Sequence, residues 1–191
     1  MNPKVERALG TLLRGARADE KYLAFNDPRF AAAPASINLT SSVFVNGGPM
    51  PKRYAGTGVG DNISPPLGWS DLPAATRELV LIMQDPDAPL PRPVTHVAVT
   101  GIPIGWTGLA EGALAPNARP PLAFARGTFG QIGYAGPRPV LGHGLHRYVF
   151  QIFALGRKLA LPPQPKLELV LAAIAETILA RGVLVGTYER A

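Results

Sequence analysis

Residues 84–96, with the sequence QDPDAPLPRPVTH, form a polar, proline-rich segment between two apolar stretches. The apolar run 79–83 before it predicts a buried strand, and the alternating apolar residues over 97–102 predict a second one. Four prolines within eight residues restrict the backbone at their own positions and at the residues before them. We therefore expect a stiff connection that holds two aspartates and a histidine in a preorganised site.

Length and composition limit the architecture. A chain of 191 residues has the size of one domain and can bury a substantial core. Hydrophobic residues make up 47%, which excludes wholesale disorder, while 21 prolines and 21 glycines favour many turns and short elements over long helices. We expect a compact, turn-rich domain.

The charge balance favours anionic partners without identifying one. Nineteen lysines and arginines against thirteen acidic residues leave a net charge of +6. The basic residues are scattered, apart from a basic-leaning segment over 4–21 that acidic residues interrupt, and we find no nucleic-acid-binding motif. We therefore expect no nucleic acid among the partners.

The absence of cysteine excludes disulfides and thiolate metal sites. The N-terminus lacks the apolar stretch of a signal peptide, and the densest apolar run, 169–175, is far shorter than a membrane span. These features predict a cytoplasmic protein without an integral membrane segment.

Residues 3–16 predict an amphipathic helix, because apolar residues recur at helical spacing after a proline near its start. The basic face of this helix could touch a lipid surface, but packing on the body with a solvated charged side is the favoured interpretation. Residues 31–36 are rich in Ala, Pro and Ser and predict a connector. We divide the chain into an N-terminal helical extension and connector, 1–36, and a single domain, 37–191.

Strands and turns dominate the first part of this domain. An alternating pattern predicts a strand over 37–40, and glycine-rich stretches at 46–49 and 56–62 predict turns at the surface. Residues 103–133 show neither helical nor strand periodicity. They predict an irregular excursion of the kind that often borders a binding site.

Two histidines open predicted strands. Alternation places His96 and Ala98 on one face of the first strand. It places His146 and Tyr148 on the face of the apolar strand 149–155 that carries a phenylalanine and an isoleucine. Each histidine thus lies at the mouth of a core strand.

The C-terminal part predicts a helix over 165–181, which Gly182 is well placed to end, and a final short strand over 183–188. Many strands with helices confined to the two ends of the chain favour a mostly antiparallel β architecture.

The histidines and aspartates suggest an anion site if they converge in space. A carboxylate of Asp85 that accepts one imidazole N–H would leave His96 and His146 able to present donors to an anion. Backbone N–H groups near Gly136 and Gly144 could add donors. The alternative is structural: the aspartates cap turns and the histidines are satisfied core groups. The residues alone leave both interpretations open.

Other chemistries have weaker support. His143, His146 and an aspartate have suitable types for a metal site, but their spacing is a weak signal. A serine hydrolase would need a Gly-x-Ser-x-Gly motif, which the chain lacks. Asp85 and Asp87 are too close in sequence to flank a sugar bond. We therefore expect no metal and no cofactor.

Residues 85–89, His96 and 144–148 together resemble the two signature motifs of the phosphatidylethanolamine-binding protein family, which includes the Raf kinase inhibitor proteins. Further segments resemble the bacterial branch of this family: 41–44, 47–51, 62–69, 134–137 and 185–188. The resemblance covers about residues 37–190, and the order of its two long motifs makes it specific.

The resemblance implies a mostly β, sandwich-like fold with a large antiparallel sheet, a smaller sheet, and peripheral N- and C-terminal helices. It also implies a shallow pocket that binds phosphate-like anions, with residues 134–139 at one rim. The ligand-binding residues expected here are Asp85, Pro89, His96, His146 and Tyr148, together with Gly136 and Gly144.

Two further expectations concern residues around this pocket. Asp87 and Arg147 are expected to form an ion pair behind it. At the rim, Val140 follows Pro139 where similar proteins carry a second proline, and Arg138 stands where they carry a small residue. An arginine at this position either adds a charge to the anion site or blocks it.

We therefore predict a non-enzymatic binding protein with a small pocket for a phospholipid head group, a phosphorylated metabolite or a phosphorylated side chain. The resemblance allows regulation of a kinase or protease, and hence a protein partner. The alternative is a hydrolase of an ester or phosphoester, with His96 or His146 as general base and Asp85 orienting it. Protein interaction through the 103–133 loop and a homodimer also stay open.

Overall fold

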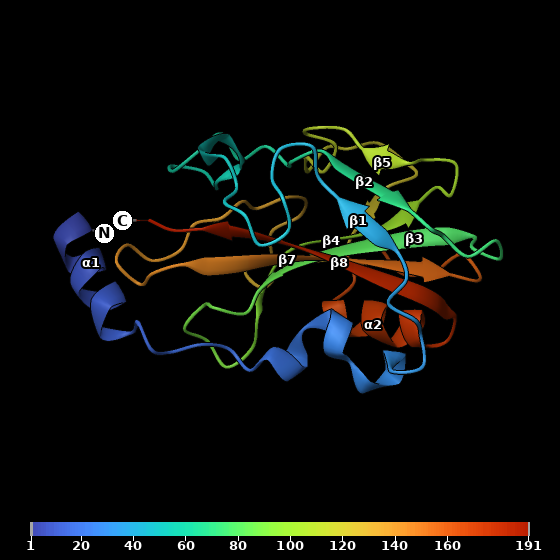
Figure 1. The fold of residues 1–191 in the computed structure, drawn as a ribbon, viewed down its shortest axis with the longest axis horizontal. Coiled ribbons are helices and arrows are strands. Elements are labelled where there is room, and N and C mark those ends of the chain that lie inside the picture. Colours follow the sequence, from blue (N-terminus) through green and yellow to red (C-terminus); the bar gives the residue numbers. More distant parts are fainter. Residues whose placement is uncertain (1, 191) are drawn as a thin grey trace.

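The computed structural model describes residues 2–190, which form two antiparallel sheets and two α-helices (Figure 1). The smaller sheet has the order β1-β2-β5, and the larger sheet has the order β6-β4-β3-β7-β8. The elements are α1 (Pro3–Leu12), β1 (Asn38–Thr40), β2 (Leu67–Ser70), β3 (Glu78–Asp85), β4 (Val94–Ile102), β5 (Gly108–Leu109), β6 (Ala123–Phe124), β7 (His146–Leu155), α2 (Leu167–Ala175) and β8 (Ile178–Tyr188). The predicted mostly β fold, with a large sheet, a smaller sheet and peripheral helices, is confirmed.

The large sheet lies between the small sheet and a layer of helices, so both of its faces are covered (Figure 1). The effect is clearest in the central strand β3, in which all eight residues are buried. Leu81 and Met83 point into the core between the sheets, whereas Val80 and Ile82 point into the core under the helices. A strand covered on both faces has no polar side, which explains the continuous apolar run in its sequence.

The N-terminal extension packs along the helical side of the large sheet (Figure 1). Two buried glutamines of this sheet hold it there. The side-chain oxygen of Gln84 accepts a hydrogen bond from the backbone N–H of Ala24 at 2.8 Å, and that of Gln151 accepts one from Phe25 at 2.6 Å. The oxygen of Gln84 also accepts a hydrogen bond from the side-chain nitrogen of Gln151 at 3.0 Å, so the extension adds a second donor to Gln84 and supplies the donor for the buried oxygen of Gln151.

The division of the chain at residue 36 into an extension and a domain stays a prediction. In the structure the two parts pack against each other. α1 ends at Leu12, earlier than the predicted residue 16. Neither helix in the described part of the chain has the length and apolarity needed to cross a bilayer.

The segment 103–133 is mostly irregular, as predicted, but it contributes the two-residue strands β5 and β6, one to each sheet. Strands this short leave no periodicity that a sequence could reveal.

The C-terminal helix is shorter than predicted, and the strand after it is longer. We predicted a helix over 165–181, whereas α2 ends at Ala175 and β8 begins at Ile178. Residues 178–181 were predicted as helix and favour helix by propensity, but their antiparallel pairing with β7 makes them a strand. Gly182, expected to end the helix, lies inside β8, where a Cβ would approach the carbonyl oxygen of Ile37 to 2.3 Å. Close contact between two chain segments therefore accounts for this glycine.

Phe30 tests whether the extension is part of the folded core. Its ring is fully buried and packs edge-on against Phe153 of β7, with centroids 5.4 Å apart. We predict that Phe30→Ala lowers the free energy of unfolding by about 3 kcal/mol, because it removes a large buried ring. Phe129→Ala, at an exposed phenylalanine, should change it by less than about 0.5 kcal/mol. Urea denaturation of both variants measures the difference. Equal stabilities would show that the extension contributes little to the core.

Candidate functional site

A cavity of about 690 Å³, here called the strand-end cavity, opens where β3 ends and where β4 and β7 begin. These strands are neighbours in the order β4-β3-β7, and their antiparallel arrangement brings the three ends together. The predicted site residues that line it are Asp85, Pro89, His96, Gly136, His146 and Tyr148. The remaining predicted residue, Gly144, is not part of the lining, and we do not expect its N–H to reach a ligand there.

Asp85, the last residue of β3, is buried and fully engaged by the protein. One carboxylate oxygen accepts hydrogen bonds from the backbone N–H groups of Asp87 at 2.7 Å and Ala88 at 3.1 Å. The other oxygen lies 2.7 Å from Nδ1 of His146, which donates to it. Asp85 therefore caps the turn after β3 and orients an imidazole at the same time, so the two roles weighed from the sequence are combined.

His96 enters the cavity because of a β-bulge. In the pairing of β3 with β4, Met83 lies opposite Val97 and Gln84 lies opposite Thr95, which leaves His96 as the extra residue. The predicted alternation of His96 with Ala98 is therefore wrong. The bulge turns the imidazole to the side of the sheet that carries Tyr148, and the two rings meet edge to face with centroids 5.2 Å apart.

Two polar atoms in the cavity have no protein partner. Nδ1 of His96 donates to the carbonyl oxygen of Ala135 at 2.6 Å, so the other ring nitrogen, Nε2, is left over. Within residues 2–190, neither this Nε2 nor the hydroxyl oxygen of Tyr148 has a hydrogen-bond partner of normal geometry, although both are buried. The backbone N–H of Arg138 lies near the Tyr148 hydroxyl and acts against the rise in its pKa, but it does not form a full hydrogen bond with it. A cavity with unpaired polar atoms on its wall is suited to a small polar ligand.

Burial sets the protonation of both groups. It lowers the pKa of His96 despite the opposing effect of the Asp85 charge, so the ring is neutral near pH 7. Burial, assisted by the same charge, raises the pKa of the Tyr148 hydroxyl, which therefore keeps its proton. The unliganded cavity offers a nitrogen lone pair and an O–H donor.

His146 does not present a free nitrogen to a ligand, in contrast to our expectation. Its Nδ1 donates to Asp85, and its Nε2 lies 2.8 Å from Nδ1 of His143. Burial lowers the pKa of His143, and the charges of His146 and Arg17 lower it further. A distance of 2.8 Å between the two ring nitrogens is that of a hydrogen bond, so Nε2 of His146 is occupied by His143. A gap of 2.8 Å leaves no room for a metal ion between them.

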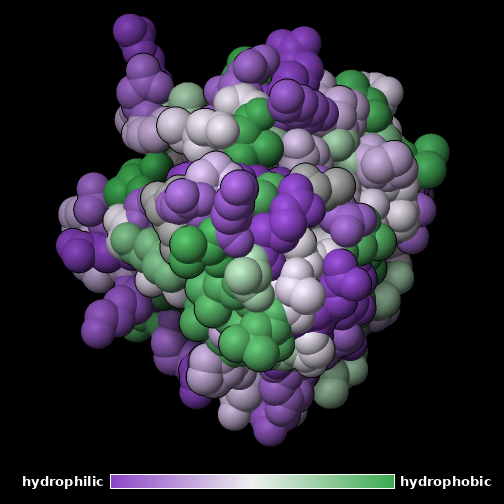
Figure 2. All heavy atoms as spheres, turned by 90° about the vertical axis from the view of Figure 1, so that its left-hand side faces the viewer, coloured by the Kyte–Doolittle hydropathy of each residue, from purple (hydrophilic) through white to green (hydrophobic). Residues whose placement is uncertain are grey.

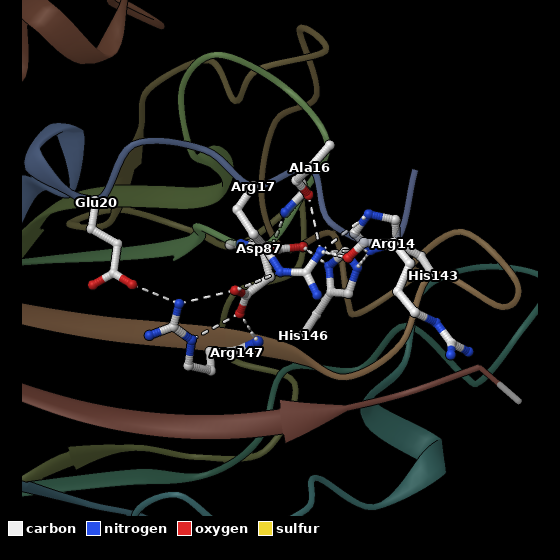
Figure 3. A network of polar contacts seen from close by, with 10 residues as sticks. Arg14, Ala16, Arg17, Glu20, Asp87, His143, His146 and Arg147 are labelled. Atoms are coloured by element: carbon white, nitrogen blue, oxygen red, sulfur yellow. Dashed lines mark hydrogen bonds and ion pairs between the residues drawn. The ribbon is translucent and has the colours of Figure 1, made fainter. Parts of the chain in front are cut away.

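The expected ion pair between Asp87 and Arg147 is present behind the cavity (Figure 3). Nε of Arg147 lies 2.9 Å from one carboxylate oxygen of Asp87, and Nη2 lies 2.9 Å from the other. Nη2 also donates to Glu20 at 2.7 Å. Burial alone would raise the pKa of Asp87, but hydrogen bonds from Arg147 and the charges around it lower it. The carboxylate is therefore ionised, and it links the turn after β3 to β7.

Arg17 of the N-terminal extension contacts both Asp87, which pairs with Arg147, and His143, which contacts His146 (Figure 3). Its Nε lies 3.2 Å from a carboxylate oxygen of Asp87, and its Nη1 lies 3.3 and 3.2 Å from the two ring nitrogens of His143. Because the distances from Nη1 to the two nitrogens are nearly equal, it does not point along a single lone pair. The contact places a positive charge beside the ring, which favours neutral His143.

Asn62 positions the rim of the cavity. Its side-chain oxygen accepts a hydrogen bond from the N–H of Gly136 at 2.8 Å, and its amide nitrogen donates to the carbonyl of Tyr134 at 3.3 Å. The N–H of Gly136 is thus occupied and is not a free donor for a ligand. A Cβ at Gly136 would lie 2.2 Å from the carbonyl oxygen of Tyr54, so only glycine fits where these loops meet. Arg138, exposed at the same rim, is the lone lysine or arginine of the lining within residues 2–190.

Sequence reasoning missed three residues of this site. Asn62 closes a glycine-rich turn that we interpreted only as surface structure, although Gly56 and Thr57 of that turn also line the cavity. His143 was considered solely as a metal ligand. Arg17 comes from the extension, and nothing in its local sequence indicates that it would reach the cluster. Its position in the basic-leaning N-terminal segment was the one available signal.

Known proteins resemble this chain in both sequence and fold. The family model described as phosphatidylethanolamine-binding protein matches residues 40–189. The UPF0098 protein of Aquifex aeolicus is 40% identical over 171 residues, which cover 88% of this chain and 97% of that relative.

Two solved bacterial structures have a similar fold. CT736 of Chlamydia trachomatis, described as a putative phosphatidylethanolamine-binding protein homolog, has 35% identity and a TM-score of 0.73, covering 82% of this chain and 99% of its own. YbcL of E. coli, described as a new member of the mammalian PEBP family, has 27% identity and a TM-score of 0.76, covering 82% of this chain and 100% of its own.

The protonation of His96 predicts a pH dependence of stability. A native pKa below the ordinary value of about 6.5 means that the unfolded chain binds more protons in the window just below that value. The free energy of unfolding should therefore fall as pH drops through this window. His96→Gln should lose less stability between about pH 6.5 and 5, by up to about 1.4 kcal/mol per pH unit.

Urea denaturation over this pH range, in buffers free of phosphate and sulfate, measures the effect. Carboxylates with lowered pKa values, such as Asp87, contribute at lower pH and do not obscure it. Parallel pH profiles for the wild type and His96→Gln would contradict a neutral, buried His96.

Proposed function

Because the chain belongs to the phosphatidylethanolamine-binding protein family, as a member of the bacterial type, we propose that it is a binding protein whose strand-end cavity takes a phosphate-like anion. The supporting observation is the pair of buried polar atoms without protein partners, Nε2 of His96 and the hydroxyl of Tyr148. An unsatisfied buried polar group costs about 1–3 kcal/mol, so a ligand that satisfies both gains binding energy.

The anionic character of the ligand follows from the charges around the cavity. The negative charge of Asp85 is already compensated by two backbone N–H groups and by His146. Arg138 at the rim contributes a positive charge that faces solvent. An anion next to His96 raises the pKa of its imidazole, so the ring takes up a proton and Nε2 changes from acceptor to donor. Binding is therefore coupled to proton uptake.

This chemistry is shared by a phosphorylated metabolite, a phosphorylated side chain of a kinase or protease partner, and a phospholipid head group. All three present tetrahedral oxygens to a charged imidazole, a tyrosine hydroxyl and a guanidinium group.

The hydrolase alternative has less support in this geometry. Both nitrogens of His146 are engaged, which leaves Nε2 of His96 as the free imidazole nitrogen that faces the cavity. No serine or cysteine lines the cavity within the described residues, so the two commonest nucleophiles of ester hydrolysis are absent from its wall. Binding without turnover is the simpler use of these groups.

Sulfate is the sharpest probe of this proposal, because its own charge stays constant while His96 titrates. We predict that sulfate binds more tightly as pH falls from 7.5 to 5.5, by up to about tenfold per pH unit for one proton taken up. His96→Gln should weaken binding by about tenfold or more, and Arg138→Gln by about two- to fivefold. Isothermal titration calorimetry in buffers of different ionisation enthalpy measures affinity and proton uptake together.

Arg157→Gln is the matched control, because Arg157 is an exposed arginine that follows the opposite end of β7. It should leave sulfate affinity unchanged. Titration with phosphoethanolamine then shows whether a head group adds affinity beyond the anion. Absence of binding at millimolar sulfate, or affinity that is independent of pH, would contradict the proposal. Hydrolysis of p-nitrophenyl esters or phosphates that is lost in His96→Gln would favour the hydrolase.

A further inference from the structure

Helix α1 turns its apolar side away from the protein. Val5, Leu9 and Leu12 recur at intervals of four and three residues and form one stripe along the helix. Their exposed fractions are 57, 40 and 81%. An amphipathic helix on a globular body normally buries its apolar stripe. From the sequence we expected α1 to pack on the body with its charged side in solvent. This prediction is wrong for the apolar stripe, which is exposed.

Other residues attach α1 to the body. Gly10 is the buried residue of the helix, and a Cβ at this position would lie 2.1 Å from the carbonyl oxygen of Leu141. The side-chain oxygen Oε1 of Glu6 accepts a hydrogen bond from the backbone N–H of Leu141 at 3.2 Å and pairs with Arg190. A rotation that buried the stripe would separate these groups and press a side chain against the Leu141 backbone. The outward orientation of the stripe is thus built into the contact.

The stripe lies at the same end of the molecule as the strand-end cavity. Val140 lines the cavity, and the adjacent Leu141 contacts α1. Figure 1 shows α1 at this end, beside the loop that precedes β7. Figure 2 views this end directly and shows hydrophobic side chains gathered in a patch among hydrophilic ones.

The surroundings of the stripe are basic. Residues 2–17 contain four cations, Lys4, Arg7, Arg14 and Arg17, of which Arg17 is paired with Asp87. They contain one acidic residue, Glu6, whose charge is neutralised by Arg190. Lys4 is exposed and stands in the first turn of the same helix as Val5. An exposed apolar stripe flanked by cations is complementary to the interface of an anionic bilayer, where hydrocarbon lies beneath negative head groups.

We propose that α1 inserts its Val5–Leu9–Leu12 stripe into the interface of an anionic lipid membrane. A second copy of the chain is the less suitable occupant, because a two-fold contact through the stripe would bring the same cations of both copies together. Insertion itself does not require a ligand in the strand-end cavity. It would, however, hold the end of the molecule that carries the cavity next to the lipid head groups.

Vesicle flotation of the full chain tests the proposal. The wild type should bind vesicles of phosphatidylcholine and phosphatidylglycerol in equal amounts, should bind pure phosphatidylcholine less, and should be released by salt. Leu12→Glu should weaken binding to the mixed vesicles by at least about tenfold, since it removes apolar area from the interface and adds a negative charge. Leu12→Trp should retain binding, because an aromatic ring suits the interface.

Leu169→Glu is the matched control. Leu169 is an exposed leucine on α2, so the substitution makes the same chemical change on the other helix and should leave vesicle binding unchanged. Calorimetry with sulfate separates the two proposals. Leu12→Glu should bind sulfate as the wild type does, and Leu12-dependent flotation without any sulfate binding would overturn the cavity proposal alone.

Three results would overturn the membrane proposal. The first is a wild type that stays free of the mixed vesicles. The second is flotation that persists in Leu12→Glu and is lost in His96→Gln, since attachment would then occur through the cavity. The third is a dimer seen by analytical ultracentrifugation that Leu12→Glu dissociates, combined with no vesicle binding, which would assign the stripe to a second copy.

Discussion

A buried carboxylate at the end of a strand that is covered on both faces must find all of its hydrogen-bond partners within the protein, and this requirement organises one end of the molecule. Asp85 meets it with two N–H groups from its own turn and with the imidazole of His146. The first two bonds set the path of the proline-rich loop away from β3. The third ties that loop to the beginning of β7. Loss of either partner set would leave a charge buried in a region of low dielectric, where an unpaired ion is strongly unfavourable.

The parts of the site that depend on one strand alone could be predicted from the sequence, and the parts that depend on neighbouring segments could not. The simple alternation in β7 correctly places His146 and Tyr148 on the same face, where both line the strand-end cavity. The face of His96 was mispredicted, because it depends on a β-bulge whose extra residue is defined by pairing with β3 rather than by local sequence. The occupied Nε2 of His146 was equally hidden, since it depends on how the loop before β7 folds back. Periodicity describes a strand by itself, and the site is formed by relations between strands.

The same reasoning applies to the fold. Two sheets, their antiparallel character and the peripheral helices follow from the pattern of short apolar strands and from the family resemblance. The boundary between α2 and β8 does not, because a run of Leu, Ala and Ile suits either structure until a neighbouring strand is present to pair with it. The extension is a further case. Gln84 and Gln151 are polar residues inside core strands, and their sequence gives no indication that backbone N–H groups more than 50 residues earlier satisfy them.

The extension connects the two unusual features at this end of the protein. Its Arg17 keeps a positive charge beside His143 and Asp87, behind the strand-end cavity, while its first helix carries an apolar stripe outside it. Inside the cavity, two polar atoms have no hydrogen-bond partner among the described residues. Outside it, the apolar side chains of α1 are exposed to water. Each is unfavourable for the free protein, the first by leaving hydrogen bonds unmade and the second by exposing hydrocarbon to water. A soluble anion would satisfy the cavity alone, and an apolar protein surface would satisfy the stripe alone. A phospholipid interface combines phosphate groups and hydrocarbon within a few ångströms of each other, so it is the class of partner for which both features of this end can be explained by one physical cause.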